Sequence, residues 1–102
     1  MLTTNQAQHT LQAPPRLVAE TRLEFRRAAL DRLEDAVRSQ APRMLVDLGH
    51  TADIDASGLG VLVLLQKRAR ERMIAVRLLH PPASVRQMLQ LTKLDYLFEL
   101  ED

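Results

Sequence analysis

The chain has 102 residues, of which 46% are apolar and 26% are charged, a length and composition that suit one globular domain and leave no room for a second. Its 14 basic and 13 acidic residues give a net charge of +1, which creates no drive toward nucleic acid or a membrane surface. There is no cysteine, which excludes disulfides, thiolate metal sites and a cysteine nucleophile. We expect a soluble, cytoplasmic protein with a flexible start at residues 1–8 and one domain over 9–102, without a signal peptide or membrane insertion.

The first third of the sequence predicts a short strand followed by a helix. The strand is expected over residues 9–13, where two prolines stop it. Apolar residues then recur at helical spacing over 21–39, with a start near Leu17 as the alternative. Thr21 and Glu24 have the spacing of a capping box, in which each side chain satisfies a free backbone N–H group.

The central part predicts strands that alternate with a second helix. Residues 43–48 contain three consecutive apolar residues, which is typical of a strand buried on both faces. A brief strand is expected over 52–55, a helix over 57–72 and a further strand over 73–79.

The C-terminal part predicts a short helix and one last element. Ser84 and Gln87 have the spacing of a second capping box, and the tail over 96–100 fits either a strand or a helix. Strands that alternate with helices at short spacing indicate an α/β domain with a largely parallel sheet and right-handed crossovers.

The hexapeptide Asp55-Ala56-Ser57-Gly58-Leu59-Gly60 is the candidate functional motif, because it carries two glycines where a strand passes into a helix. Ser57 is expected to be the N-cap, with an exposed hydroxyl beside outward-facing N–H groups where a phosphate would be stabilised. The two glycines would let another protein approach closely. From spacing alone, a simple helix cap and a tight turn explain the same residues, and short motifs of this kind are weak signals.

Enzymatic sites have little support in the sequence. The motif is not a P-loop, since no lysine follows its second glycine, and not a nucleophile elbow, since Asp55 stands where that motif needs glycine. The three histidines, His9, His50 and His80, are scattered without metal-ligand spacing. We therefore predict no catalytic residues, no metal and no cofactor. The basic residues in the range 67–72 fit a solvated helix end better than a nucleic-acid surface.

Several segments in order resemble the STAS domain (sulfate transporter and anti-sigma factor antagonist). They are residues 44–48, 54–62, 77–82 and 85–98, so that the resemblance covers about 43–100, and the helix over 21–39 fits in position. The resemblance implies a single α/β domain with a mixed, mostly parallel sheet of about four strands and helices packed mainly on one face.

The resemblance to bacterial anti-sigma factor antagonists also implies a function. Ser57 would be phosphorylated by a partner anti-sigma factor that is a Ser/Thr kinase, the unphosphorylated form would bind that partner, and a Ser/Thr phosphatase would reset the switch. The residues expected to contact the partner are Asp55, Ala56, Ser57, Gly58, Leu59 and Gly60. For Asp55, a carboxylate that the partner reads and a strand-end acid that accepts backbone N–H groups are equal alternatives.

The sequence departs from the family in ways that affect this expectation. Residues 12–17 replace a Gly-Glu-Leu-Asp-like segment that precedes the first helix in the family. Ala56 replaces a common serine, which leaves Ser57 as the serine of the motif. The alternative function is a non-phosphorylated STAS accessory subunit of a lipid-transport ABC complex or of a signalling scaffold.

Overall fold

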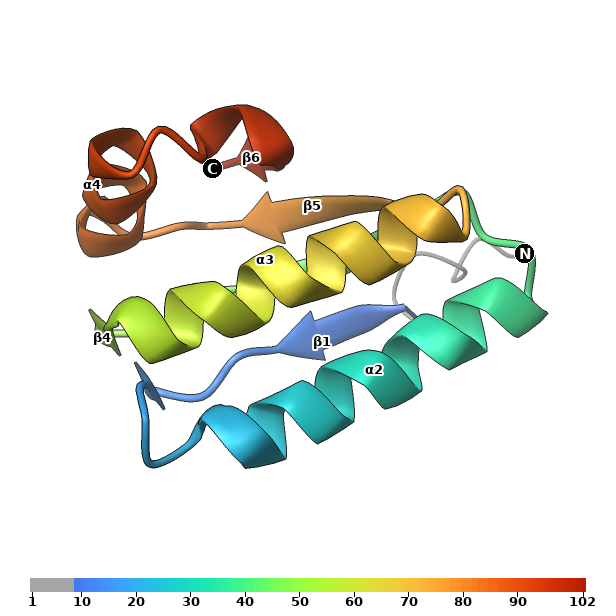
Figure 1. The fold of residues 1–102 in the computed structure, drawn as a ribbon, viewed down its shortest axis with the longest axis horizontal. Coiled ribbons are helices and arrows are strands. Elements are labelled where there is room, and N and C mark those ends of the chain that lie inside the picture. The colour runs from blue at the N-terminus through green and yellow to red at the C-terminus, as the bar shows by residue number, and fades with distance from the viewer. Residues whose placement is uncertain (1–8) are drawn as a thin grey trace.

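A four-stranded parallel sheet forms the centre of the molecule in the computed structural model, which describes residues 9–102 (Figure 1). The strand order β1-β3-β5-β6 follows the chain, and every described neighbouring pair is parallel. The strands are β1 (Thr10–Gln12), β3 (Arg43–Asp47), β5 (Ala75–Leu79) and β6 (Glu99–Glu101). The predicted α/β fold with about four strands is confirmed, and no antiparallel pairing occurs within residues 9–102.

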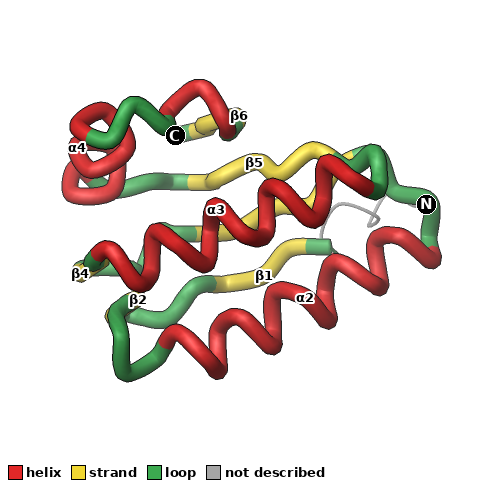
Figure 2. The backbone as a smooth tube through the Cα atoms, in the orientation of Figure 1, coloured by secondary structure: helices red, strands yellow, loops and turns green. Residues whose placement is uncertain are grey.

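Two helices cover one face of this sheet. Helix α2 (Arg22–Arg38) connects β1 to β3, and α3 (Ala56–Glu71) connects β3 to β5, so that the two helices run side by side in the same direction (Figure 2). Right-handed crossovers that always step to the next strand in one direction place their helices on the same side. The shorter α4 (Ala83–Leu91) lies beyond the end of β5 (Figure 1).

The sheet is consequently buried on its helix face and half-exposed on the other. Met44, Val46 and Leu78 point toward the helices and have no exposed surface, whereas Leu45 and Leu79 on the opposite face are half-buried. The expectation that the strand over 43–48 is covered on both faces is therefore wrong. Consecutive apolar residues also occur where the open face carries a few aliphatic side chains among charged ones.

A small second sheet holds the start of α3 in place. It pairs β2 (Arg16–Leu17) with β4 (Asp53–Ile54) in parallel, and the Leu17 side chain is fully buried. An exposed ion pair of 3.3 Å joins Arg16 to Asp53 across the two strands. Because Leu17 lies in β2, the alternative helix start near this residue is wrong.

The two predicted capping boxes are absent. Thr21 does occupy the N-cap of α2, but its hydroxyl donates to the backbone oxygen of Arg16 at 2.7 Å instead of accepting from the helix. Helix α4 has Pro82 at its N-cap, and Ser84 lies inside the first turn with no capping bond. The Thr21 hydroxyl bonds within the β2–α2 turn and is therefore not available for a capping box at α2.

Within residues 9–102, each of the helices α2, α3 and α4 is followed by a left-handed residue other than glycine. Gln40, Met73 and Lys93 have φ values of 57°, 64° and 60°. The two backbone bonds of the Schellman motif close each end, as in Ala41 N–H to Ala36 and Gln40 N–H to Val37. Because no glycine stands at these positions, the sequence lacks the usual glycine signal for a helix C-terminus.

The tail forms both elements that the sequence left open. A 3₁₀ turn, η1 (Asp95–Leu97), precedes β6 at the sheet edge. Phe98 packs into the core with 7% of its surface exposed, while Tyr96 is 77% exposed.

Candidate docking site at the start of helix α3

Asp55 is the residue that opens α3. It has extended backbone angles, and its Oδ1 accepts the N–H of Gly58 at 3.0 Å, so Asp55 is the N-cap and the prediction that Ser57 fills this position is wrong. Its Oδ2 accepts the N–H of Ala19 at 3.2 Å, which ties the β2–α2 turn to the same carboxylate. The backbone-accepting role of Asp55, one of the two alternatives, is therefore present in the structure, and its reading by a partner stays a prediction.

These N–H groups lower the pKa of Asp55 from its ordinary value, with the Gly58 N–H as the largest cause and burial opposing it. A depressed folded-state pKa means that the ionised group contributes stability above the ordinary pKa, and that this contribution is lost as the pH falls through the folded-state value. We expect Asp55→Asn, which still caps a helix but carries no charge, to show a smaller loss of stability between pH 7 and pH 2 than the wild type. Urea unfolding at both pH values measures this. Asp31→Asn, an exposed substitution on α2 and away from this cap, is the control. If Asp55→Asn and the wild type lost equal stability in acid, the stabilising role of the Asp55 charge would be contradicted.

Ser57 is the second residue of α3 and is half-buried at the surface. Its hydroxyl makes no hydrogen bond within the described residues, and it lines a surface cavity of about 220 Å³. A free hydroxyl at this place is accessible to another protein. The predicted presentation of Ser57 outside the core is thus present, although Asp55 caps the helix.

The two glycines of the motif have different environments. A Cβ on Gly58 would lie 2.0 Å from the backbone oxygen of Leu17, so glycine is needed here for the close approach of α3 to β2. A Cβ on Gly60 would meet nothing within 4 Å, and Gly60 is exposed. Internal packing explains Gly58 and leaves Gly60 unexplained, even though glycine weakens a helix interior.

The other motif residues divide between surface and core. Ala56 is exposed, whereas Leu59 is 6% exposed and belongs to the hydrophobic core. Of the six predicted residues, Gly58 and Leu59 are therefore buried, and partner contact by the other four stays a prediction.

Three residues of α2 that the sequence reasoning missed line the Ser57 cavity. They are Arg22, Leu23 and Arg26, and Leu23 is 67% exposed despite its apolar side chain. Val61 and Leu64 of α3 complete the lining. The available signal was Arg22 in the first turn of a helix, where a cation is unfavourable, with a second arginine four residues later on the same side. We call the exposed part of this region, formed by Arg22, Leu23, Arg26, Ser57 and Gly60, the docking surface.

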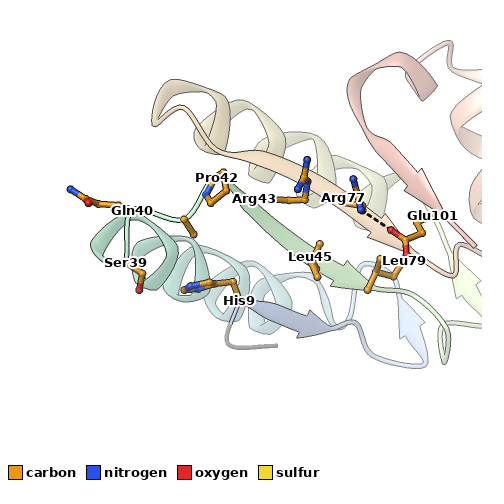
Figure 3. A pocket seen from close by; sticks show the side chains of 10 residues that line it. His9, Ser39, Gln40, Pro42, Arg43, Leu45, Arg77, Leu79 and Glu101 are labelled. Carbon is orange, nitrogen blue, oxygen red and sulfur yellow. Dashed lines mark hydrogen bonds and ion pairs between the residues drawn. The ribbon is translucent and has the colours of Figure 1, made fainter. Parts of the chain in front are cut away.

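A larger cavity of about 480 Å³ lies on the opposite face of the sheet (Figure 3). Arg43 and Arg77 line it, and both pair with Glu99, which lowers the pKa of Glu99, mainly through the Arg43 hydrogen bond. The Nδ1 atom of His9 is buried there without a hydrogen-bond partner in the described part of the chain. The sheet separates this cavity from Ser57.

Comparison with known proteins assigns the chain to a family. A family model described as "Mlab, STAS domain" matches residues 5–99. The chain belongs to the STAS domain family. No curated protein matches in sequence.

Solved structures of other STAS domains share this fold at low sequence identity. A Thermotoga maritima protein assigned as an anti-sigma factor antagonist is 23% identical over 92% of this chain and 80% of its own, with a TM-score of 0.76. A STAS domain protein from Planctomyces limnophilus is 20% identical over 91% and 80%, with a TM-score of 0.79. The phosphorylated form of the Bacillus cell fate determinant SpoIIAA is 16% identical over 98% and 86%, with a TM-score of 0.64.

Residues 9–102 of this STAS domain hold neither a candidate metal-binding cluster nor a helix that could span a membrane. No group of three or more histidine and acidic side chains is arranged to hold a metal ion. Among the described helices, none combines the length and the apolar character needed to cross a bilayer.

Proposed function

We propose that this STAS domain is an anti-sigma factor antagonist that docks to a partner through the start of α3 and is switched by phosphorylation of Ser57. The observation that carries the proposal is the free, accessible Ser57 hydroxyl in a docking surface that combines exposed apolar and basic side chains. The similarity in fold to SpoIIAA, which has been solved in a phosphorylated form, supports it.

The proposed reaction transfers the γ-phosphoryl group of ATP to Ser57. The bond from Ser57 Oγ to phosphorus forms, the bond from the γ-phosphorus to the β–γ bridging oxygen breaks, ADP leaves, and a base of the kinase accepts the hydroxyl proton. The catalytic groups belong to the partner anti-sigma factor, and a phosphatase removes the phosphate. The STAS domain supplies the hydroxyl and the surface.

A charged product at this place would change docking more than folding. A phosphoserine carries about −1.5 to −2 charges, and the first turn of a helix stabilises such a charge. The same charge has to be desolvated when a partner that fits a neutral hydroxyl covers it, and every 1.4 kcal/mol of that cost lowers affinity about tenfold. The fold should survive phosphorylation while the complex weakens.

Phosphosite mapping with a matched serine variant tests the proposal. We expect the chain, incubated with its partner kinase and ATP, to gain one phosphate on Ser57, and Ser57→Ala to abolish it. Ser84→Ala is the control, because Ser84 is likewise the second residue of a helix and is exposed. Mass spectrometry locates the phosphate. A phosphate on Ser84 or Ser39, or none with the genuine partner, would refute the switch.

A second candidate is a non-phosphorylated accessory subunit, for example of a lipid-transport ABC complex. The matching family model is described as Mlab and not as an anti-sigma factor antagonist, which favours this candidate. The same docking surface would then bind constitutively. Ser57→Ala would leave function intact, and the chain would co-purify with a membrane ATPase.

A further inference from the structure

Arg22 and Arg26 are two cations that have no partner anion among the described residues. Both are exposed, and within residues 9–102 neither takes part in an ion pair or hydrogen bond. The arginines that do form ion pairs in the described part are Arg16, Arg38, Arg43, Arg72, Arg77 and Arg86. Like charges four residues apart, and a cation in the first turn of a helix, each destabilise a helix. The start of α2 therefore carries two positive charges that form no ion pair with any described residue of the unmodified chain.

The two arginines border the same cavity as Ser57. Its volume of about 220 Å³ exceeds that of several water molecules, at about 30 Å³ each, and so has room for a phosphoryl group. The other lining residues are not titratable: Leu23, Gly60, Val61 and Leu64. An anion on the Ser57 oxygen would meet two guanidinium groups and apolar surface.

The backbone adds positive potential at this corner. Helices α2 and α3 run in the same direction, so their N-termini lie at the same end of the molecule (Figure 1). Each N-terminus carries a partial positive charge. The carboxylate of Asp55 opposes this, but one of its oxygens accepts the Gly58 N–H and the other the Ala19 N–H, which offsets its charge.

We propose that Arg22 and Arg26 hold the phosphoryl group once Ser57 carries it, within the same chain. This inference rests on the proposed function for the statement that Ser57 is phosphorylated. Guanidinium groups bind phosphate oxygens in paired hydrogen bonds, which suits two arginines beside three terminal oxygens. The charge nearly balances, with +2 from the arginines against about −2 from the phosphate.

Through this contact, phosphorylation of Ser57 would also change the charge that the neighbouring arginines offer to a partner. In the unmodified chain the docking surface offers two free cations beside Leu23, which fits a partner segment with acidic and apolar side chains. After modification those cations are occupied by the phosphate. The partner loses its charge complement as well as the neutral hydroxyl.

A phosphoserine installed at position 57 during protein synthesis tests the contact without any kinase. Phosphorus NMR then follows the second ionisation of the phosphate with pH, because nearby cations lower its pKa. We expect this pKa to be lower by about 0.5 units or more in the otherwise wild-type chain than in Arg22→Gln/Arg26→Gln. Arg27→Gln/Arg68→Gln, which replaces two exposed arginines that do not line the Ser57 cavity, removes the same number of charges and should behave as wild type.

The outcomes separate this inference from the proposed function. An equal phosphate pKa in the wild-type and Arg22→Gln/Arg26→Gln backgrounds, with both chains folded by circular dichroism, overturns the arginine contact. A shift produced equally by Arg27→Gln/Arg68→Gln also overturns it, because it would report net charge alone. A phosphate held by the arginines in a chain that no partner kinase modifies sustains the contact and refutes the phosphorylation switch.

Discussion

Gly58→Ala is expected to destabilise the fold by about 3 kcal/mol or more, which is a large part of the 5–15 kcal/mol typical of a domain. The added Cβ would lie 2.0 Å from the Leu17 backbone oxygen and 2.8 Å from both the Leu17 carbonyl carbon and Cγ. Leu17 cannot move away easily, because it is fully buried and its strand is hydrogen-bonded to β4. The backbone of α3 would have to shift, and the Asp55 cap with it.

Urea unfolding followed by circular dichroism measures this loss, and Gly60→Ala provides the opposite-signed control. Gly60 lies two residues further along the same helix with open space around its Cβ position, so alanine there should stabilise the fold by about 0.5–1 kcal/mol. A Gly58→Ala midpoint close to that of the wild type would show that α3 does not need its close approach to β2.

The architecture could be predicted because the spacing of apolar residues and the order of the elements indicate the same fold. Apolar residues at helical spacing gave α2 and α3, and alternation of helices with apolar strands gave a parallel sheet. The residues of β3 alone could not predict that helices leave one face of the sheet uncovered. Leu45 has the same neighbours in sequence whether a helix covers it or not, and the sequential strand order leaves it on the uncovered side.

The details of the site depended on contacts distant in sequence. Aspartate and serine are equally good N-caps, so the pattern could not choose between Asp55 and Ser57, whereas Ala19 and Gly58 together determine the choice in the fold. Arg22 is more than thirty residues from Ser57, and only the packing of α2 beside α3 brings it to the same cavity. Motif reasoning therefore located the hydroxyl and missed the charges around it.

Gly60→Gln is expected to weaken partner binding by about 100-fold, or about 2.7 kcal/mol, while leaving the fold at least as stable as the wild type. The site is exposed, and a Cβ there meets nothing within 4 Å, so the domain accommodates the side chain. Glutamine is also a better helix residue than glycine. Glycine at this position costs helix stability and no internal contact requires it, and we propose that it permits the close approach of a partner.

Titration calorimetry with the purified partner protein, together with urea unfolding, gives both quantities for one variant. Ala28→Gln adds a side chain of the same kind at an exposed position of α2 outside the docking surface and should leave affinity unchanged. Both candidate functions use this surface, so the result does not depend on whether Ser57 is phosphorylated. Unchanged affinity in Gly60→Gln would move the interface away from the start of α3, and the proposed role of the docking surface in partner binding would lose its basis.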